Sequence, residues 1–186
     1  MSRVPLVTED VLTLEQRPVV DAILAVASRG RRIPAPYQLT LHCPELTDKW
    51  QQIGALLRYR TSLPLRISEL AILITARHWN CDYEWYAHAP VARGAGIDEG
   101  VIQAIRHGKQ PELGATVDAV IYGYCSDLLR NHFVNDATHR AVRDIFGVTG
   151  VIELTALIGY YVMVAMALNA HDYPLPADAD ERLPAL

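Results

Sequence analysis

The chain has 186 residues, of which 51% are hydrophobic and 20% charged, and its formal net charge is −4. This size and composition are typical of a soluble globular protein with a substantial core. The net charge is negative and the sequence has no basic cluster, whereas proteins that bind nucleic acids carry basic surfaces, so we do not expect a nucleic-acid partner. We expect one domain over residues 1–186, with a core at about 45–170, an N-terminal arm and a proline-rich C-terminal tail.

Helical periodicity runs through the chain, while Asn-Gly and Asp-Gly hairpin turns are absent, so we predict an all-α fold. The expected helices, in chain order, are 8–30, 44–59, 68–79, 81–94, a short helix capped by Asp98, 113–133, 135–146 and 153–168. Gly30 is expected to end the first helix, Thr47 or Asp48 to cap the second, and Gly147 to end the helix that starts at Asp136. The proline-rich segment 31–44 is expected to be a loop.

The cysteines and the N-terminus favour a cytoplasmic protein. Cys43, Cys81 and Cys125 are odd in number and form no C-x-x-C, so a disulfide framework is not expected. The first ten residues lack the apolar region of a signal peptide. The apolar stretch 151–168 is close to membrane-spanning length, but we expect a buried or intersubunit helix and no membrane association. Its surplus of apolar residues favours a homo-oligomer.

The stretch RHWNCDYEWYAHAPVA, residues 77–92, concentrates reactive and aromatic side chains. Four residues spaced i, i+3, i+4 and i+7 share one face of a helix: Cys81, Glu84, Trp85 and His88. Glu84 is four residues before His88 and can hydrogen-bond to the imidazole and orient it. Together with Trp79 as a second aromatic wall, this face has the ingredients of general acid–base or nucleophilic catalysis.

The same face also has an ordinary structural interpretation. Glu–His pairs four residues apart are common on solvated helices, and a lone cysteine is usually a small buried hydrophobic residue. The chain has no H-E-x-x-H motif, and Glu84 with His88 supplies only two metal ligands. We therefore predict no metal site and no cofactor.

The sequence LPLRISELAILITARHWNCDYEWYAHAPVARGAGIDEGVI resembles the core of the carboxymuconolactone decarboxylase family, which includes the alkylhydroperoxidase D proteins. In that family a Glu opens one helix and a C-x-x-C-x-x-x-H motif follows on the next. Glu69 matches the Glu, Cys81 the first Cys and His88 the His, whereas Glu84 occupies the position of the second Cys. The later sequence ELTALIGYYVMVAMALNAH resembles the C-terminal helix of long members that carry E-W-x-x-H.

The resemblance implies an all-α, alkylhydroperoxidase D-like fold, a homotrimer or hexamer, and a site between helices near a subunit interface. It implies two activities: reduction of a hydroperoxide by a cysteine pair, or decarboxylation of a carboxylated lactone. Because Glu84 replaces the second Cys, the local resolving thiol is missing. A carboxylate beside Cys81 is also expected to raise the pKa of its thiol.

Three functions follow as hypotheses. In the first, His88 moves a proton on a small carboxylated or lactone substrate, and Glu69 acts as relay. In the second, Cys81 reduces a peroxide and an external thiol resolves it. In the third, the chain is a non-enzymatic oligomer, either a small-ligand-binding protein or a stress protein. The expected catalytic residues are Glu69, Cys81, Glu84 and His88, and the expected substrate-binding residues are Trp79, Trp85, Tyr83 and Arg77, with the cationic Arg77 suited to an anionic group.

Overall fold

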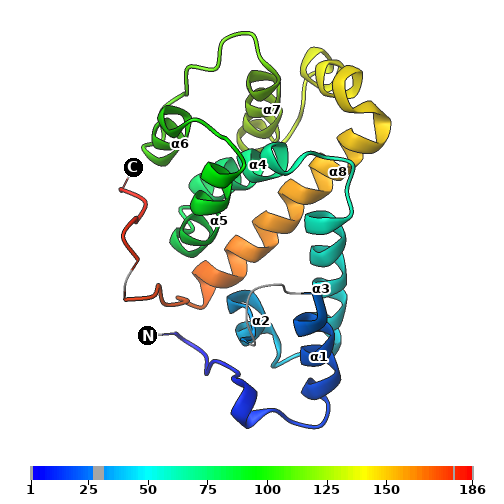
Figure 1. Cartoon of the computed structure of the whole chain (residues 1–186), viewed down its shortest axis with the longest axis vertical. Helices are drawn as coiled ribbons and strands as arrows, with labels where there is room; N and C mark the ends of the chain where they lie inside the picture. The colour runs from blue at the N-terminus through cyan, green and yellow to red at the C-terminus, as the bar shows by residue number, and fades with distance from the viewer. Residues whose placement is uncertain (1, 27–31, 178, 186) are drawn as a thin grey trace. The chain divides into compact units, whose positions relative to one another are not determined.

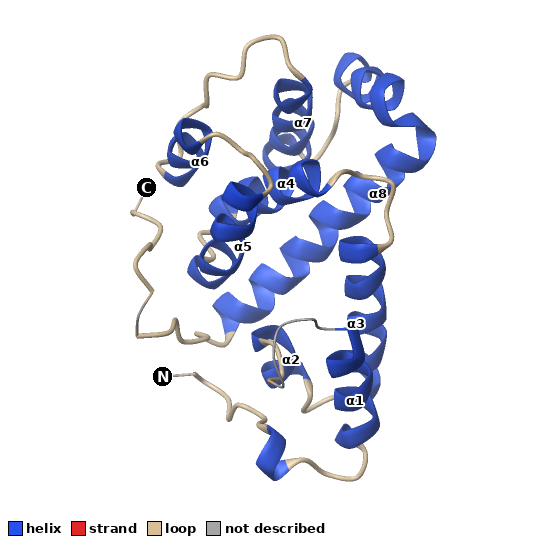
Figure 2. Cartoon of the chain, in the orientation of Figure 1, coloured by secondary structure: helices blue, strands red, loops and turns tan. Residues whose placement is uncertain are grey.

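The computed structural model describes residues 2–26, 32–177 and 179–185. Within these ranges the chain forms helices and loops and no strand (Figure 2), which confirms the predicted all-α fold. The helices in chain order are η1 (Glu9–Val11), α1 (Gln16–Val26), α2 (Ala35–Thr40), α3 (Pro44–Tyr59), α4 (Leu65–His78), α5 (Asp82–Gly94), α6 (Glu99–Arg106), α7 (Val117–Ser126), η2 (Asp127–Asn131) and α8 (Asp136–Ala170), as labelled in Figure 1.

The chain divides into two compact units, Met1–Arg60 with Met166–Pro174, and Thr61–Ala165 with Leu175–Leu186. In the first unit, α1 and α2 both pack against α3. Its buried cluster includes Val20, Ile23 and Leu41. The single domain expected over residues 1–186 stays a prediction.

The second unit is built around α4. Eleven of its fourteen residues are buried, from Ile67 to Arg77, and α5, α6 and α7 all pack against it. Pro64 precedes its first turn, where a fixed φ favours helix initiation, and Arg77 and His78 lie in the last turn, where cations interact favourably with the helix dipole. A helix buried on all sides holds its side chains in fixed positions, which suits a site.

A tight turn joins α4 to α5. Asn80 adopts the left-handed conformation with φ of 47°, which asparagine tolerates better than most residues. The amide of Cys81 then donates to the carbonyl of Ala76 over 2.9 Å. The chain therefore turns at Asn80, and the two helices that carry the motif form a hairpin.

Several predicted boundaries were wrong for local reasons. The segment 31–44 contains the short helix α2. Cys43, not Thr47 or Asp48, is the N-cap residue of α3, because Pro44 already has a helical φ at the first position. The predicted helix 113–133 begins only at Val117, and the Gly30 terminus of the first predicted helix lies outside the described residues. Asp98 does cap α6, since its side chain accepts from the amide of Gly100 over 2.8 Å.

The two last predicted helices, 135–146 and 153–168, both lie in α8, whose backbone leaves the helical conformation at Gly147, the residue predicted to end the helix that starts at Asp136. This glycine has φ of 71° and ψ of −179°, a conformation that side-chain-bearing residues rarely adopt. By length and composition alone α8 could cross a membrane, but half of its apolar window is buried within the molecule.

Candidate active site

The centre of the site is a hydrogen bond between the two helices of the α4–α5 hairpin. Nδ1 of His88, on α5, lies 2.7 Å from Oε2 of Glu69, on α4. The two residues are only 6% and 3% exposed. A carboxylate can only accept, so Nδ1 carries the proton. Nε2 is then the ring nitrogen that Glu69 does not use and that remains for proton transfer. This arrangement fixes both the orientation and the tautomer of the imidazole.

A tyrosine from α8 completes the immediate surroundings of His88. The ring of Tyr161 stands edge-on to the imidazole, with 5.1 Å between ring centroids and an interplanar angle of 89°. Tyr161 in turn packs edge-on against Tyr160 at 5.5 Å. The sequence reasoning missed Tyr161, because nothing in the apolar run of α8 distinguishes which tyrosine faces α5.

The carboxylate on Nδ1 comes from α4, whereas the four-residue spacing had favoured Glu84. A pair four residues apart meets on one helix surface, but Glu69 reaches His88 from the facing helix of a tightly packed hairpin. Glu84 is itself buried on α5. Its catalytic role stays a prediction.

Cys81 is the N-cap residue of α5 and is 1% exposed. Burial, with a smaller contribution from the Glu84 carboxylate, raises the pKa of its thiol to about 12, although the amides of Glu84 and Tyr83 act in the opposite direction. Removal from water disfavours the thiolate, which is the nucleophilic form. The direction expected from Glu84 is confirmed, but burial is the larger cause.

We expect one of the three thiols to react with Ellman's reagent in the native protein at pH 8. Cys43 is exposed, whereas Cys81 and Cys125 are buried and each has a pKa raised to about 12. At pH 8 such a thiol is about one part in ten thousand thiolate, and the fraction rises tenfold per pH unit until the pKa is reached. Absorbance titration should give one thiol in the native protein and three in denaturant. A Cys43→Ser variant that still releases one native equivalent would contradict the assignment.

The expected substrate-binding residues lie in different surroundings. Trp85 is completely buried, and Trp79 and Tyr83 are half-buried. Tyr83 packs against Tyr86, with ring centroids 6.0 Å apart. Arg77, at the end of α4, is buried and its Nη1 donates to the carbonyl of Pro184 over 2.9 Å. Their role toward a substrate stays a prediction.

The described residues can also be searched for a group of side chains that could bind a metal ion. Among the described residues, no three His, Cys, Asp or Glu side chains are grouped so that they could hold a metal ion. The Glu69–His88 pair already uses Nδ1 for the carboxylate, so the pair acts through a proton rather than as a bidentate ligand. Acid–base chemistry is what this geometry supports.

Comparison with known proteins places the hairpin in a family. Residues 44–121 match the model of the carboxymuconolactone decarboxylase family, a range that contains Glu69, Cys81, Glu84 and His88. The comparison with curated proteins found no match.

Solved structures show the same fold over nearly the whole chain. An alkylhydroperoxidase AhpD core, an uncharacterized peroxidase-related protein from Ralstonia eutropha JMP134, is similar with a TM-score of 0.77 and 17% identity, over 95% of this chain and 93% of that one. An uncharacterized peroxidase-related protein from Silicibacter sp. TM1040 gives a TM-score of 0.76 and 14% identity, over 98% and 96%. A protein of unknown function from Agrobacterium tumefaciens gives 0.65 and 15%, over 75% and 96%. Identities this low carry the fold alone. Residues 44–121 thus match the carboxymuconolactone decarboxylase family model, and the chain has the all-α fold of the alkylhydroperoxidase D core.

Proposed function

We propose that the chain is a decarboxylase-like enzyme in which His88, held by Glu69, transfers a proton on a small carboxylated substrate such as a carboxylated lactone. The observation that carries this proposal is the buried 2.7 Å bond between Nδ1 of His88 and Glu69, beside a thiol that burial keeps protonated. The match to the family model supports an enzymatic role. Of the two activities known in that family, the replacement of the second Cys by Glu84 favours decarboxylation over hydroperoxide reduction.

The proposed reaction balances with one proton. The bond between the carboxylate carbon and the lactone ring breaks, CO₂ leaves, and the electron pair enters the conjugated ring as an enolate-type anion. Nε2 of a protonated His88 donates its proton to a carbon of that anion, and the imidazole then takes a proton from water. Glu69 stabilises the imidazolium before this step. Trp79, Tyr83 and Arg77 are the proposed substrate contacts.

The test uses two assays on one preparation. We expect the purified protein to release CO₂ from carboxymuconolactone and not to consume cumene hydroperoxide in the presence of dithiothreitol. Cys81→Ser should retain decarboxylation within about threefold, because the buried thiol has no part in the proton transfer. Peroxide consumption by the wild type that disappears in Cys81→Ser would refute the proposal and establish a thiol peroxidase.

That second candidate has one specific observation in its favour, the likeness to peroxidase-related proteins. In it, the Cys81 thiolate attacks the peroxide, the O–O bond breaks, an alcohol leaves after protonation, and an external thiol reduces the sulfenic acid. A pKa of about 12 makes the first step slow at neutral pH. We therefore rank it second. Either reaction is compatible with the reducing cytoplasm that we propose as the location, since all three cysteines are free.

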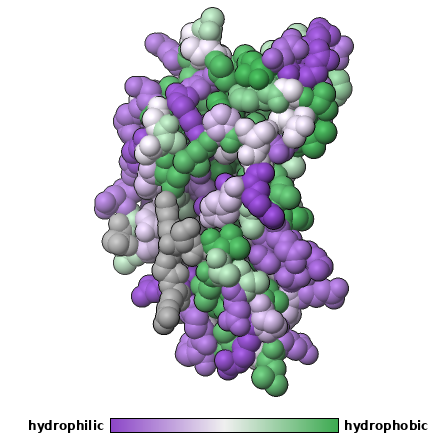
Figure 3. Space-filling model, turned by 45° about the vertical axis from the view of Figure 1, so that its right-hand side comes forward, coloured by the Kyte–Doolittle hydropathy of each residue, from purple (hydrophilic) through white to green (hydrophobic). Residues whose placement is uncertain are grey.

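We also propose that the active form is a homo-oligomer, a trimer or a hexamer. Beyond its kink, α8 exposes an apolar row that includes Val148 at 65% and Ile152 at 64% exposure and continues through Ala156 and Gly159. Apolar side chains lie among hydrophilic ones on the molecular surface in Figure 3. An apolar row on the outer side of a helix whose other side is buried is typical of a subunit interface.

Light scattering coupled to gel filtration checks this proposal. The expected mass is three or six times the 20.7 kDa of the chain. Ile152→Glu should shift the population toward monomer, because a carboxylate would have to be buried in the interface. Lys109→Glu, at an exposed position, is the matched control and should leave the mass unchanged. A wild type that elutes as a monomer at micromolar concentration would exclude the oligomer.

A further inference from the structure

Arg77 at the end of α4 is a charged side chain with an incomplete set of partners. It is 4% exposed. Its Nη1 donates to the carbonyl of Pro184, whereas Nε and Nη2 are buried and have no hydrogen-bond partner among the described residues. Burial lowers the pKa of the guanidinium and the nearby Asp82 raises it. Arginine nevertheless keeps its charge in proteins, so buried N–H donors without partners carry a substantial desolvation cost.

The two donors without partners are chemically specific. Nε–H and one N–H of Nη2 point in the same direction from one edge of the planar guanidinium. This edge is the one that grips a carboxylate through two parallel hydrogen bonds. The third nitrogen, Nη1, is the one already used by Pro184. The pattern therefore leaves a complete two-donor edge for an anion of carboxylate shape.

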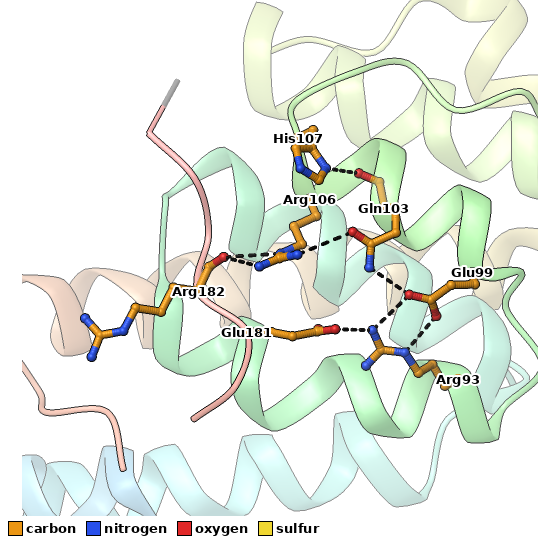
Figure 4. A network of polar contacts seen from close by, with 7 residues as sticks. All are labelled: Arg93, Glu99, Gln103, Arg106, His107, Glu181 and Arg182. Carbon is orange, nitrogen blue, oxygen red and sulfur yellow. Dashed lines mark hydrogen bonds and ion pairs between the residues drawn. The ribbon is translucent and has the colours of Figure 1, made fainter. Parts of the chain in front are cut away.

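A short segment, residues 181–184, lies over this arginine, and we name it the C-terminal strap. Each of its four residues is bonded to the hairpin or to α6: Glu181 to Arg93 over 2.7 Å, the Arg182 carbonyl to Arg106 over 2.8 and 3.2 Å, the Leu183 amide to Asp82 over 2.8 Å, and the Pro184 carbonyl to Arg77. Figure 4 shows the outer part of this network, in which Arg93 and Arg106 point toward the strap.

The outer anchor of the strap is charged and partly exposed. Arg93 contacts Glu99 at 2.7 and 3.0 Å as well as Glu181, and its guanidinium lowers the pKa of Glu99 to about 2. The Arg93 and Glu181 side chains are each about one-third exposed. Partly exposed ion pairs contribute little to stability, so the strap is held by contacts that can open at modest cost.

We propose that the Nε–Nη2 edge of Arg77 binds a carboxylate group and that the C-terminal strap is the lid that closes over it. The strap bonds to Nη1 and leaves Nε and Nη2 without a hydrogen-bond partner, so the contact with the strap and a bond to a carboxylate use different nitrogens of Arg77. This edge has almost no accessible surface, so part of the chain has to move before a ligand enters, and the strap, which contacts Arg77 and is anchored by a partly exposed ion pair, is the segment that we propose opens. Its closure then removes water from the ion pair and strengthens it.

The bound carboxylate has two sources to distinguish. Arg77 lies eight residues after Glu69 on the same helix, about 12 Å along the axis. A substrate can carry its own carboxylate to Arg77, or a separate carboxylate can bind there as a regulator. Assigning the group to the substrate rests on the proposed function, whereas the binding and the lid do not.

The binding test observes the arginine directly. In a ¹⁵N–¹H spectrum, the Nε–H signal absent from Arg77→Lys identifies Arg77. We expect it to move downfield and saturate on titration with sodium acetate or disodium muconate, and to stay in place with sodium chloride at equal ionic strength. Arg140→Lys, at an exposed arginine of α8 outside the strap network, is the matched control and should keep the response. An identical response to chloride, or no saturable response to either carboxylate, would overturn the proposal.

The lid is tested by hydrogen exchange at the Leu183 amide, which bonds to Asp82. Muconate should slow its exchange in the wild type and not in Arg77→Lys. Glu181→Gln loosens the strap and should weaken carboxylate binding about two- to fivefold, the range of a partly exposed ion pair, while the Arg77 signal still responds. Tighter binding in Glu181→Gln would show that the strap competes with the ligand and would refute the lid.

Competition identifies the source of the carboxylate. If muconate raises the KM for carboxymuconolactone without changing kcat, Arg77 holds the carboxylate of the substrate. An unchanged KM would refute that assignment and leave a separate carboxylate site. A protein without decarboxylase activity would refute the proposed function but leave the two binding measurements intact, because neither needs turnover.

Discussion

Replacing His88 with Ala is expected to lower kcat/KM for decarboxylation by about 10²–10⁴-fold, the usual contribution of a positioned general acid or base. The imidazole is the proposed proton donor of the buried pair, and Glu69 holds it in one tautomer. Steady-state rates with carboxymuconolactone measure the effect. Most of the loss should appear in kcat, because the proton moves in the transition state and contributes little to ground-state binding.

Glu69→Gln separates orientation from charge in the same pair. Glutamine can still accept from Nδ1–H, but it cannot stabilise the imidazolium. We expect a smaller loss of kcat/KM than in His88→Ala, because the hydrogen bond that orients the imidazole is kept. His107→Gln, on an exposed histidine that bonds to the carbonyl of Gln103, is the control. If His88→Ala decarboxylated carboxymuconolactone at the wild-type rate, the proposal that His88 transfers the proton would be refuted.

Replacing Trp85 with Ala is expected to lower the free energy of unfolding by about 3–5 kcal/mol, since a completely buried Trp leaves a large cavity. Urea denaturation followed by circular dichroism measures this change. Trp85→Phe should restore most of the stability and leave the KM unchanged, because an aromatic ring refills the core.

The same pair of variants tests the role expected for Trp85 as a substrate wall. Wild-type stability together with a raised KM in Trp85→Phe would mean that the ring contacts substrate. Trp79 provides the comparison, because it is half-buried at the end of the hairpin. Truncating Trp79 should cost less stability than truncating Trp85 and should affect the KM if it contacts the substrate.

The sequence by itself determined the local structure of the hairpin. Apolar periodicity marks α4 and α5, Pro64 precedes the first turn of α4, and Asn80 makes the turn between the two helices, because propensity and φ restrictions act over a few residues. The motif of Glu, Cys and His at fixed spacing was enough to identify the family, and the absence of strand signals was enough for the all-α class. The Cys43 cap of α3 and the short helix α2 were missed, because a helix boundary is a balance of small local energies.

Only the tertiary structure decided the chemistry of the site. The spacing of four favoured Glu84 as the partner of His88, but packing of α5 on α4 places Glu69 at Nδ1 and Tyr161 against the ring. The pKa of Cys81 depends mainly on how much water the packed helices exclude, and the strap over Arg77 joins residues about a hundred positions apart. Spacing along a chain describes one helix, whereas partners, burial and desolvation are set by which helices pack together.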